Sequence, residues 1–453
     1  MTDEAPLRFL IIGGGPAGTA AATVAASLGA DVTLVEDSIV GGAAHLLDCI
    51  PSKTMVATSI RMNAIRGAEK LGIVLGDARV DLERLGDRID AISSDLETRS
   101  VKILESQGVN IVKGWGRFTG PNTAVASTDD GDIEIQFDRA LVSTGSSPRA
   151  PEWANVDGER ILTTRHAYDL PEVPKHMVVI GSGVTGVEMV HIFESLGCDV
   201  TLVVSRQQVL PHRDAEVAAV LEESFLDRGV RLLKGARATS ISRQGDDVVV
   251  DADDGRQVIA SHVMLAIGSA PLTDKLGLTD AGVETDHGYV PVDGYQRTNQ
   301  QHIYAAGDVT GQMPLSSVAS MQGRKIARLV MDHPETPMDF SNVAQAIFTD
   351  PEIASVGLEE AVAAAEGRKV RITEVPFAAN PRSLIHGADG GFVKVISDPA
   401  TRVVLGGTIV GHRASELIGI LALATTGKLK VDILVDTLMV HPSLSESISD
   451  AGE

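Results

Sequence analysis

The sequence contains little cysteine, few basic residues and no long apolar run. Cys49 and Cys198 are the only cysteines among 453 residues, so a disulfide framework is excluded and a reducing, cytoplasmic location is expected. The formal net charge of −22 argues against a nucleic-acid partner, because binding phosphates requires clustered Lys and Arg. Residues 10–30 are nearly uncharged, but closely spaced glycines interrupt them. We therefore expect neither a targeting segment nor a membrane-spanning segment.

Length and composition indicate a multidomain α/β protein. A chain of 453 residues exceeds the size of one ordinary core, so roughly two to four domains are expected. The hydrophobic fraction is 43%, and the chain has 45 glycines and 19 prolines. This composition is typical of globular proteins rather than disordered or fibrous ones.

A dinucleotide-binding fingerprint lies near the start of the chain. Residues 8–12 predict a buried strand, an Ala-rich helix extends to Leu28, and a second strand over residues 32–35 ends at Glu36. Between the first strand and the helix, the first glycine allows a tight turn, the second admits a pyrophosphate, and the third lets helix pack on strand. The helix N-terminus then faces the phosphates, and Glu36 accepts hydrogen bonds from a ribose. The predicted binding residues of this loop are Gly13, Gly15, Pro16, Ala17 and Gly18.

The dinucleotide-binding fingerprint occurs a second time, but without the acidic residue at its end. A strand over residues 177–180 precedes a helix that ends at Leu196, and the next strand over residues 200–204 is followed by Ser205 and Arg206. Loss of the acid removes the repulsion of a 2′-phosphate, which Ser205 and Arg206 could bind. This favours NADPH, although the third glycine suits NADH as well and both cofactors stay open. The glycines of this fingerprint are Gly181, Gly183 and Gly186.

Residues 41–53 contain a partly emptied redox motif. The segment reads Gly-Gly-Ala-Ala-His-Leu-Leu-Asp-Cys-Ile-Pro-Ser-Lys. It resembles the redox-active segment of the pyridine nucleotide-disulfide oxidoreductases, which have a cysteine pair spaced C-x-x-x-x-C. Cys49 stands at the second cysteine position and Ala44 at the first. The resemblance adds Gly42, Ala43 and Lys53 to the predicted FAD contacts.

Further motifs extend the resemblance along the whole chain. Thr144 and Gly145 begin one copy of the crossover motif of this family, and Gly268 belongs to the other; Gly307 and Asp308 match the motif that binds the ribityl chain of FAD. The resemblance implies an α/β fold with two Rossmann-like (doubly wound) dinucleotide-binding domains and an α+β C-terminal dimerisation domain. The expected boundaries are an FAD-binding domain in two parts, an inserted NAD(P)-binding domain and an interface domain, over residues 1–146 with 271–340, 147–270 and 341–453. The implied cofactors are FAD and NAD(P)H, the implied assembly is a homodimer, and no metal site is expected.

The resemblance also assigns roles near the flavin. Lys53 and Glu188 match a pair beside flavin N5, where an ammonium stabilises the reduced ring. Cys49 matches the flavin-proximal cysteine, although its part in the chemistry is open because a lone thiol cannot cycle through an internal disulfide. His441 and Glu446 match an acid/base pair that serves the partner's active site. We expect Cys198 to be structural.

The missing cysteine changes the expected substrate. Without the exposed thiol, the enzyme has no nucleophile for lipoamide or glutathione disulfide, whereas hydride transfer from NAD(P)H needs no thiol pair. The sequence therefore predicts an FAD-dependent oxidoreductase that passes electrons from NAD(P)H to quinones or similar acceptors, with His441 as a candidate proton donor and His45 as a second. A soluble pyridine nucleotide transhydrogenase, an atypical dihydrolipoyl dehydrogenase and a flavin-bearing sensor are the alternatives.

Overall fold

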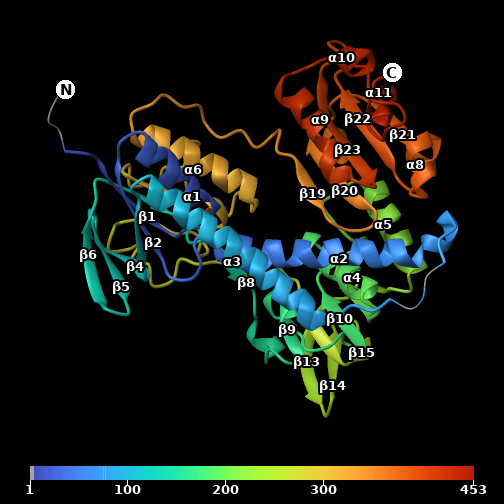
Figure 1. Cartoon of the computed structure of the whole chain (residues 1–453), viewed down its shortest axis with the longest axis horizontal. Coiled ribbons are helices and arrows are strands. Elements are labelled where there is room, and N and C mark those ends of the chain that lie inside the picture. Colours follow the sequence, from blue (N-terminus) through green and yellow to red (C-terminus); the bar gives the residue numbers. More distant parts are fainter. Residues whose placement is uncertain (1–4, 75, 77) are drawn as a thin grey trace. The chain divides into compact units, whose positions relative to one another are not determined.

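The computed structural model describes residues 5–74, 76 and 78–453. The chain divides into two compact units, each assembled from separate segments (Figure 1). The first unit comprises Met1–Ser52, Gly86–Pro148 and Ser269–Asp339, and the second comprises Lys53–Leu85, Arg149–Gly268 and Phe340–Glu453. Residues 53–85 therefore belong to the second unit, whereas the rest of the predicted FAD-binding segment over residues 1–146 belongs to the first unit.

A parallel sheet forms the centre of the first unit. Its strands follow the order β18-β7-β1-β2-β3, with bounds Ile303–Ala305, Arg139–Val142, Arg8–Ile12, Asp31–Glu36 and Asn110–Lys113. Phe9 and Ile11 belong to the core on one face of this sheet, and Leu10 and Ile12 belong to the core on the other. Residues 9–12 of β1 form an uninterrupted apolar run because both faces of the sheet are covered.

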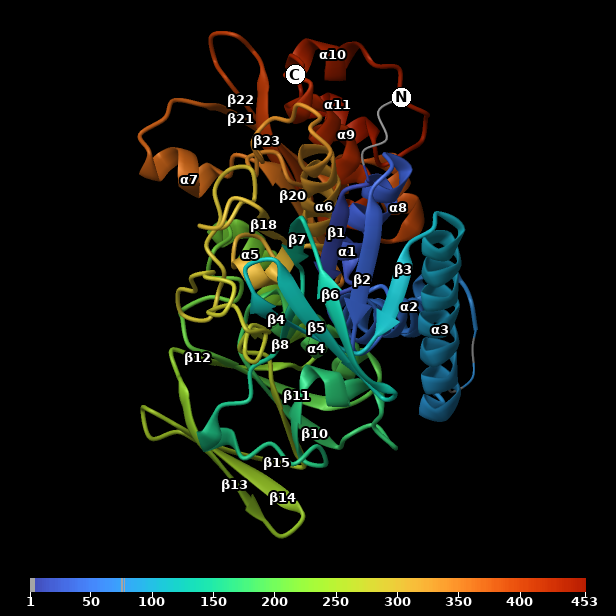
Figure 2. The same cartoon turned by 90° about the vertical axis from the view of Figure 1, so that its left-hand side faces the viewer.

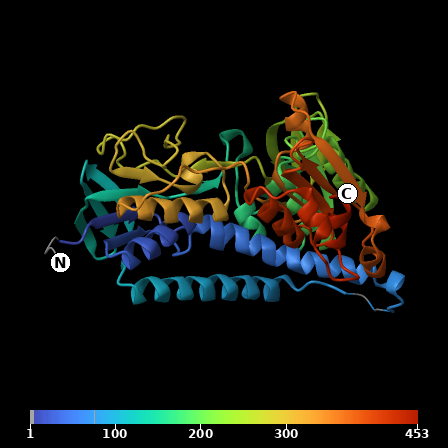
Figure 3. The same ribbon diagram turned by 90° about the horizontal axis from the view of Figure 1, so that it is seen from above.

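Helices and a small antiparallel sheet cover the two faces in the first unit. Helices α1 (Pro16–Ser27) and α6 (Ser316–Val330) pack along each other and lie side by side in Figures 1 and 3. The long helix α3 (Leu82–Ser106) contributes Leu104 to the same core. The other face carries strands β4 (Trp115–Gly120), β5 (Thr123–Thr128) and β6 (Gly131–Gln136), visible together in Figure 2.

The second unit repeats the doubly wound arrangement. Its parallel sheet has the order β12-β11-β10-β16-β9, with bounds Arg231–Lys234, Asp199–Val204, His176–Ile180, His262–Leu265 and Ile161–Thr163. The second unit also contains the helices α4 (Val184–Ser195) and α5 (Ala215–Asp227), and α2 (Ile50–Arg66) from Lys53 onward. A separate antiparallel sheet consists of the strands β13 (Ala238–Gln244), β14 (Asp247–Ala252) and β15 (Gln257–Ala260). The two parallel sheets have equivalent strand orders, in agreement with the repeated fingerprint.

The C-terminal part is an antiparallel sheet with helices. The strand order is β19-β20-β23-β22-β21, with bounds Gln345–Ile347, Glu352–Gly357, Val404–Gly411, Phe392–Ser397 and Arg371–Pro376. Helix α9 (Ala414–Thr426) packs on β20 and β23. Shorter helices are α7 (Glu360–Ala365), α8 (Pro381–His386), α10 (Val431–Asp436) and α11 (Glu446–Asp450). The predicted fold class, two Rossmann-like domains and an α+β C-terminal domain, is confirmed.

The predicted elements are found with small shifts at their ends. The fingerprint helices end at Ser27 and Ser195, one residue before the predicted Leu28 and Leu196. Leu85, Ile89, Ile92 and Leu96 recur at helical spacing and predict a long helix that Gly108 closes. The structure shows this helix as α3. Within the described residues, no helix combines the length and apolar character that crossing a bilayer requires.

Candidate functional site

The first fingerprint forms a turn that admits no larger side chains. Gly13 has φ +104°, and a Cβ on Gly18 would lie 2.0 Å from the carbonyl oxygen of Gly13. Pro16 and Ala17 open helix α1, whose N-terminus has no side-chain cap and no acidic residue in its first turn. An uncapped N-terminus leaves unpaired N–H groups and a partial positive charge. This end of α1 therefore fits a phosphate group.

Glu36 and Gly42 border the same turn. Glu36 ends β2 and is buried; its carboxylate accepts hydrogen bonds from the N–H groups of Gly14 at 2.6 Å and Ser38 at 2.8 Å. Burial raises the pKa of Glu36, and these two hydrogen bonds oppose the shift. Each carboxylate oxygen keeps a lone pair for the ribose contact that the sequence predicts. A Cβ on Gly42 would lie 2.5 Å from the Cα of Gly15, so the two predicted contact glycines touch.

The segment that follows Thr144 and Gly145 contacts the segment of Gly307 and Asp308, and both segments lie in the first unit. Strand β8 (Ser146–Pro148) pairs with β17 (Ser269–Pro271), next to the turns of Gly145 (φ +72°) and Gly268 (φ +90°). The Oγ of Ser146 donates to the carboxylate of Asp308 at 2.7 Å. Gly307 precedes this aspartate with φ +77°. Ser146 is a contact of the motif that the sequence reasoning missed, because the two residues are far apart in the chain.

The remaining predicted residues of this region lie around these motifs. Thr144 directs its hydroxyl to the carbonyl oxygen of Leu272 at 2.6 Å, and Ala43 directly precedes the turn that contains the redox position. The glycine turns, the uncapped helix end and the Asp308 carboxylate together fit a dinucleotide such as FAD.

The redox segment adopts a π-helical turn. The turn η1 spans Ala44–Cys49 and continues into α2, with the N–H of Ile50 donating to the carbonyl oxygen of His45. A π-helix brings residues i and i+5 together, so the turn places Ala44 next to Cys49. Ser93 stabilises this turn, because its hydroxyl donates a hydrogen bond to the carbonyl oxygen of Leu46 at 2.7 Å. Position 44, at the first residue of the turn, carries a methyl group in place of the CH2–SH group of a cysteine.

The two cysteines have different surroundings, and neither forms a disulfide. Cys198 is buried in the second unit, and burial raises the pKa of its thiol to about 12. A thiol with this pKa is unreactive near neutral pH, in agreement with the structural role predicted for it. Cys49 is partly exposed. His45, the second candidate proton donor, is half-buried, and burial lowers the pKa of its imidazole.

Lys53 and Glu188 form an ion pair in the second unit. The Nζ of Lys53 donates to the carboxylate of Glu188 at 2.7 Å, and the side chains are 30% and 5% exposed. The other carboxylate oxygen of Glu188 accepts the N–H of Phe348 at 3.0 Å, and the ammonium lies 4.9 Å from the centre of the Phe348 ring. The structure thus joins the two residues that the resemblance pairs. Phe348 is an additional contact of this pair that the sequence motifs do not indicate.

In the second fingerprint, as in the first, the third glycine has no room for a side chain. A Cβ on Gly186 would lie 1.8 Å from the carbonyl oxygen of Gly181, whereas a Cβ on Gly183 would meet open space. Open space at the second glycine leaves the backbone accessible to a phosphate. Ser205 and Arg206 follow β11 and are exposed, so both side chains can reach a ligand.

His441 and Glu446 are also in contact. The Nδ1 of His441 lies 2.7 Å from the carboxylate of Glu446, and that carboxylate accepts the N–H of Ser443 at 2.8 Å. The Ser443 N–H and then His441 lower the pKa of Glu446. The histidine side chain is 70% exposed, so the glutamate orients a ring that stands at the surface of this chain.

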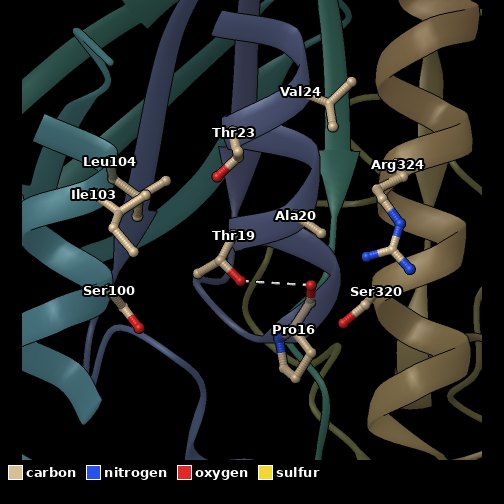
Figure 4. A pocket seen from close by; sticks show the side chains of 10 residues that line it. All are labelled: Pro16, Thr19, Ala20, Thr23, Val24, Ser100, Ile103, Leu104, Ser320 and Arg324. Carbon is tan, nitrogen blue, oxygen red and sulfur yellow. Dashed lines mark hydrogen bonds between the residues drawn. The ribbon is translucent and has the colours of Figure 1, made fainter. Parts of the chain in front are cut away.

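A separate hollow of about 240 Å³ lies in the first unit among helices α1, α3 and α6 (Figure 4). Pro16 lines it, whereas the other predicted site residues do not. This volume is below the range typical of cofactor pockets. The hollow meets the predicted dinucleotide site at Pro16.

Comparison with known proteins places these features in a family. Residues 7–323 match the family described as pyridine nucleotide-disulphide oxidoreductase, and residues 343–451 match the dimerisation domain of that family. A protein of Mycobacterium tuberculosis named NAD(P)H dehydrogenase (quinone) is 42% identical over 98% of this chain and 93% of its own length. Dihydrolipoyl dehydrogenase 2 of Haloarcula marismortui is 35% identical over 98% and 95%.

Two solved structures resemble the whole chain. The crystal structure of LpdA from Mycobacterium tuberculosis has a TM-score of 0.93 with 41% identity and covers 98% of this chain and 99% of its own. The HOCl-induced flavoprotein disulfide reductase RclA from Escherichia coli has a TM-score of 0.88 with 26% identity and covers 98% and 99%.

Proposed function

The chain belongs to the pyridine nucleotide-disulphide oxidoreductase family, and we propose that it passes electrons from NAD(P)H to quinones without a redox-active disulfide. One observation carries this proposal: Ala44 and Cys49 are the two ends of the π turn η1, so this turn contains a single thiol. A relay to disulfide substrates needs two thiols. The mycobacterial relative that is named a quinone dehydrogenase supports the same acceptor class.

FAD and NAD(P)H are the cofactors of this family. The residues that would hold FAD are those of the first fingerprint, Glu36, Gly42, Ala43, Thr144, Gly145, Gly307 and Asp308. Bound FAD would supply the two-electron chemistry between NAD(P)H and the acceptor. The overall reaction is NAD(P)H + H⁺ + quinone → NAD(P)⁺ + hydroquinone, so the protein must supply a proton to the quinone.

Lys53 provides the fixed positive charge in this proposal. Its ammonium is held by the Glu188 carboxylate and by the face of the Phe348 ring. A preorganised cation stabilises negative charge that develops beside it and needs no reorganisation during the reaction. Glu188 fixes the lysine, and its own position is fixed by the Phe348 N–H.

His441 is the proposed proton donor, acting in the active site of a partner subunit. The dimerisation domain over residues 343–451 indicates a homodimer, and the exposed imidazole is oriented by Glu446. A histidine whose other nitrogen is held by a carboxylate keeps a defined tautomer, which suits proton transfer. We also propose that the enzyme works in the cytoplasm, where both cysteines stay reduced.

The experiment is anaerobic stopped-flow spectroscopy of the flavin-loaded enzyme. NADPH or NADH reduces the enzyme, and menadione, lipoamide or oxidised NAD is added in parallel. Fast reoxidation by menadione and slow reoxidation by lipoamide is the expected result. Lipoamide reduction at the quinone rate would refute the proposal. Hydride exchange between the two nicotinamide cofactors at the quinone rate would indicate a transhydrogenase, and absence of flavin bleaching by either nucleotide would indicate a sensor.

A further inference from the structure

Helix α6 (Ser316–Val330) contacts both halves of the predicted FAD site through two neighbouring residues, Gln322 and Gly323. Helix α6 follows Gly307 and Asp308 in the chain and lies along α1, the helix of the first fingerprint (Figures 1 and 4). The two contacts use different chemistry, one steric and one polar. Both lie within the first unit.

Gly323 makes the steric contact. A Cβ on this residue would lie 2.1 Å from the carbonyl oxygen of Ala17 and 2.9 Å from its carbonyl carbon. No side chain fits at this distance, so the α6 backbone rests directly on the first turn of α1. That first turn is the helix end whose free N–H groups fit a phosphate. Gly323 therefore fixes α6 against the phosphate-binding end of the site.

Gln322 makes the polar contact. The side chain is 1% exposed, and its Oε1 accepts the N–H of Gly307 at 2.8 Å. Because an N–H can only donate, this bond fixes which end of the amide is oxygen. The Nε2 group then donates to the amide oxygens of Gln296 and Gln312, each at 3.1 Å. The polar atoms of Gln322 are thus all used, and the amide cannot turn without breaking a buried hydrogen bond.

The backbone that Gln322 holds leads directly to Asp308. Gly307 has φ +77°, and its own carbonyl oxygen accepts the hydroxyl of Thr310 at 2.8 Å. The next carboxylate, that of Asp308, accepts the hydroxyl of Ser146 at 2.7 Å. Hydrogen bonds therefore fix the peptide before Asp308 from the α6 side, and the side chain itself from β8.

We propose that Gln322 is a positioning residue for FAD, which together with Gly323 sets the distance between the phosphate-binding end of α1 and the Asp308 carboxylate. This inference rests on the proposed function only in that it requires the chain to bind FAD. A dinucleotide that spans both places binds tightly when their separation is correct before it arrives, because preorganisation lowers the cost of binding. Gln322 acts through the Gly307 backbone rather than by contact with the cofactor.

The test compares three substitutions on the same helix. Gln322→Leu removes the acceptor of the Gly307 N–H in a side chain of similar size. Gln322→Glu keeps an acceptor, and the amides of Gln296 and Gln312 can turn to donate to the second oxygen. Arg324→Leu is the control, because Arg324 lies two residues along the same helix, is half-buried and lines the hollow of Figure 4; it makes no hydrogen bond or ion pair within the part of the chain that the structure describes.

The readout is the dissociation constant of FAD, measured from the fluorescence of FAD that passes an ultrafiltration membrane, with the visible absorption spectrum of the bound flavin. We expect Gln322→Leu to weaken FAD binding roughly ten- to a hundred-fold, since a buried N–H loses its partner. Gln322→Glu should stay within about threefold of the unmodified protein, and Arg324→Leu should not change binding. Wild-type affinity in Gln322→Leu, or equal losses in the Leu and Glu variants, would overturn the inference.

Two further measurements keep the test decisive. If circular dichroism shows that Gln322→Leu does not fold, Gln312→Ala removes one partner of the same amide from an exposed residue. This variant is expected to weaken FAD binding severalfold, and unchanged binding contradicts the proposal. If the unmodified protein binds no FAD at all, the proposed function fails; if it binds FAD and Gln322→Leu binds equally well, only this inference fails.

Discussion

Replacing Lys53 should destabilise the protein more than replacing Glu188, its partner in the ion pair. Glu188 is 5% exposed, whereas Lys53 is 30% exposed and 4.9 Å from the centre of the Phe348 ring. Lys53→Met leaves a buried carboxylate with the N–H of Phe348 as its remaining protein contact among those described here. Glu188→Gln leaves a partly hydrated ammonium and keeps an oxygen for that N–H. The carboxylate is therefore the partner that is harder to leave alone.

The magnitudes follow from these exposures. Removing one partner of a buried pair costs about 3–5 kcal/mol, and partial exposure of the lysine lowers the expected cost of Lys53→Met to about 2–3 kcal/mol. Glu188→Gln should cost about 1 kcal/mol, because water and the aromatic face still stabilise the cation. The double substitution should be more stable than Lys53→Met alone, since no buried charge remains.

The assay is urea unfolding followed by circular dichroism, together with anaerobic reduction of the bound flavin by NADPH. Lys53→Met should slow flavin reduction by about a hundred- to a thousandfold, and the charge-conserving Lys53→Arg should retain more of the rate. The reasoning is refuted if Glu188→Gln is as destabilising as Lys53→Met, or if the double variant is no more stable than Lys53→Met. An unchanged rate in Lys53→Met would remove the lysine from the proposed chemistry.

Three other perturbations test separate parts of the account. Ala44→Cys should form a disulfide with Cys49, seen as loss of both thiols in titration of the oxidised protein, and lipoamide reduction should rise above the wild-type level because the relay is restored; unchanged lipoamide reduction counts against the assignment of Ala44. Arg206→Ala should raise the KM for NADPH about tenfold and leave that for NADH unchanged, since a charged hydrogen bond to the 2′-phosphate is lost; equal changes for both nucleotides would contradict this. Burial, with the nearby Arg228, lowers the pKa of His191 from 6.5 to about 3, so the unfolded chain binds the proton first and stability should fall by up to about 1.4 kcal/mol per pH unit as pH drops from 6.5 toward 3. Urea midpoints at pH 7 and pH 5 should differ less in His191→Asn than in the unmodified protein, and an equal pH dependence in both would refute this role.

Local steric rules made the nucleotide-binding parts predictable. Each fingerprint and the strand and helix that flank it are consecutive in the chain, and Glu36 ends the next strand, 22 residues after Gly14. The sequence therefore contains the whole binding turn. Gly18 and Gly186 show the reason directly, since a Cβ on either would collide with a backbone oxygen of the same loop. The prediction that the redox pair is missing likewise depends on a single position, Ala44.

Contacts across long stretches of chain depended on the tertiary structure. The resemblance paired Lys53 with Glu188, but their distance and the additional contact of Phe348 come from the packing of α2, α4 and β19. The pattern of glycines contains no signal for the bond between Ser146 and Asp308, which are 162 residues apart. The π-helical geometry of η1 likewise has no periodic signal in six residues.

The sequence by itself therefore determined which residues each loop offers to a ligand, and it predicts which thiol chemistry is missing, because these properties reside in short segments of chain. Only the tertiary structure decided how the loops are fixed relative to one another. Gln322 is the clearest case: its amide is an ordinary polar residue on a helix until the fold buries it against Gly307 and Gln296. A buried polar group must find its partner in three dimensions, and that partner cannot be read from neighbours along the chain.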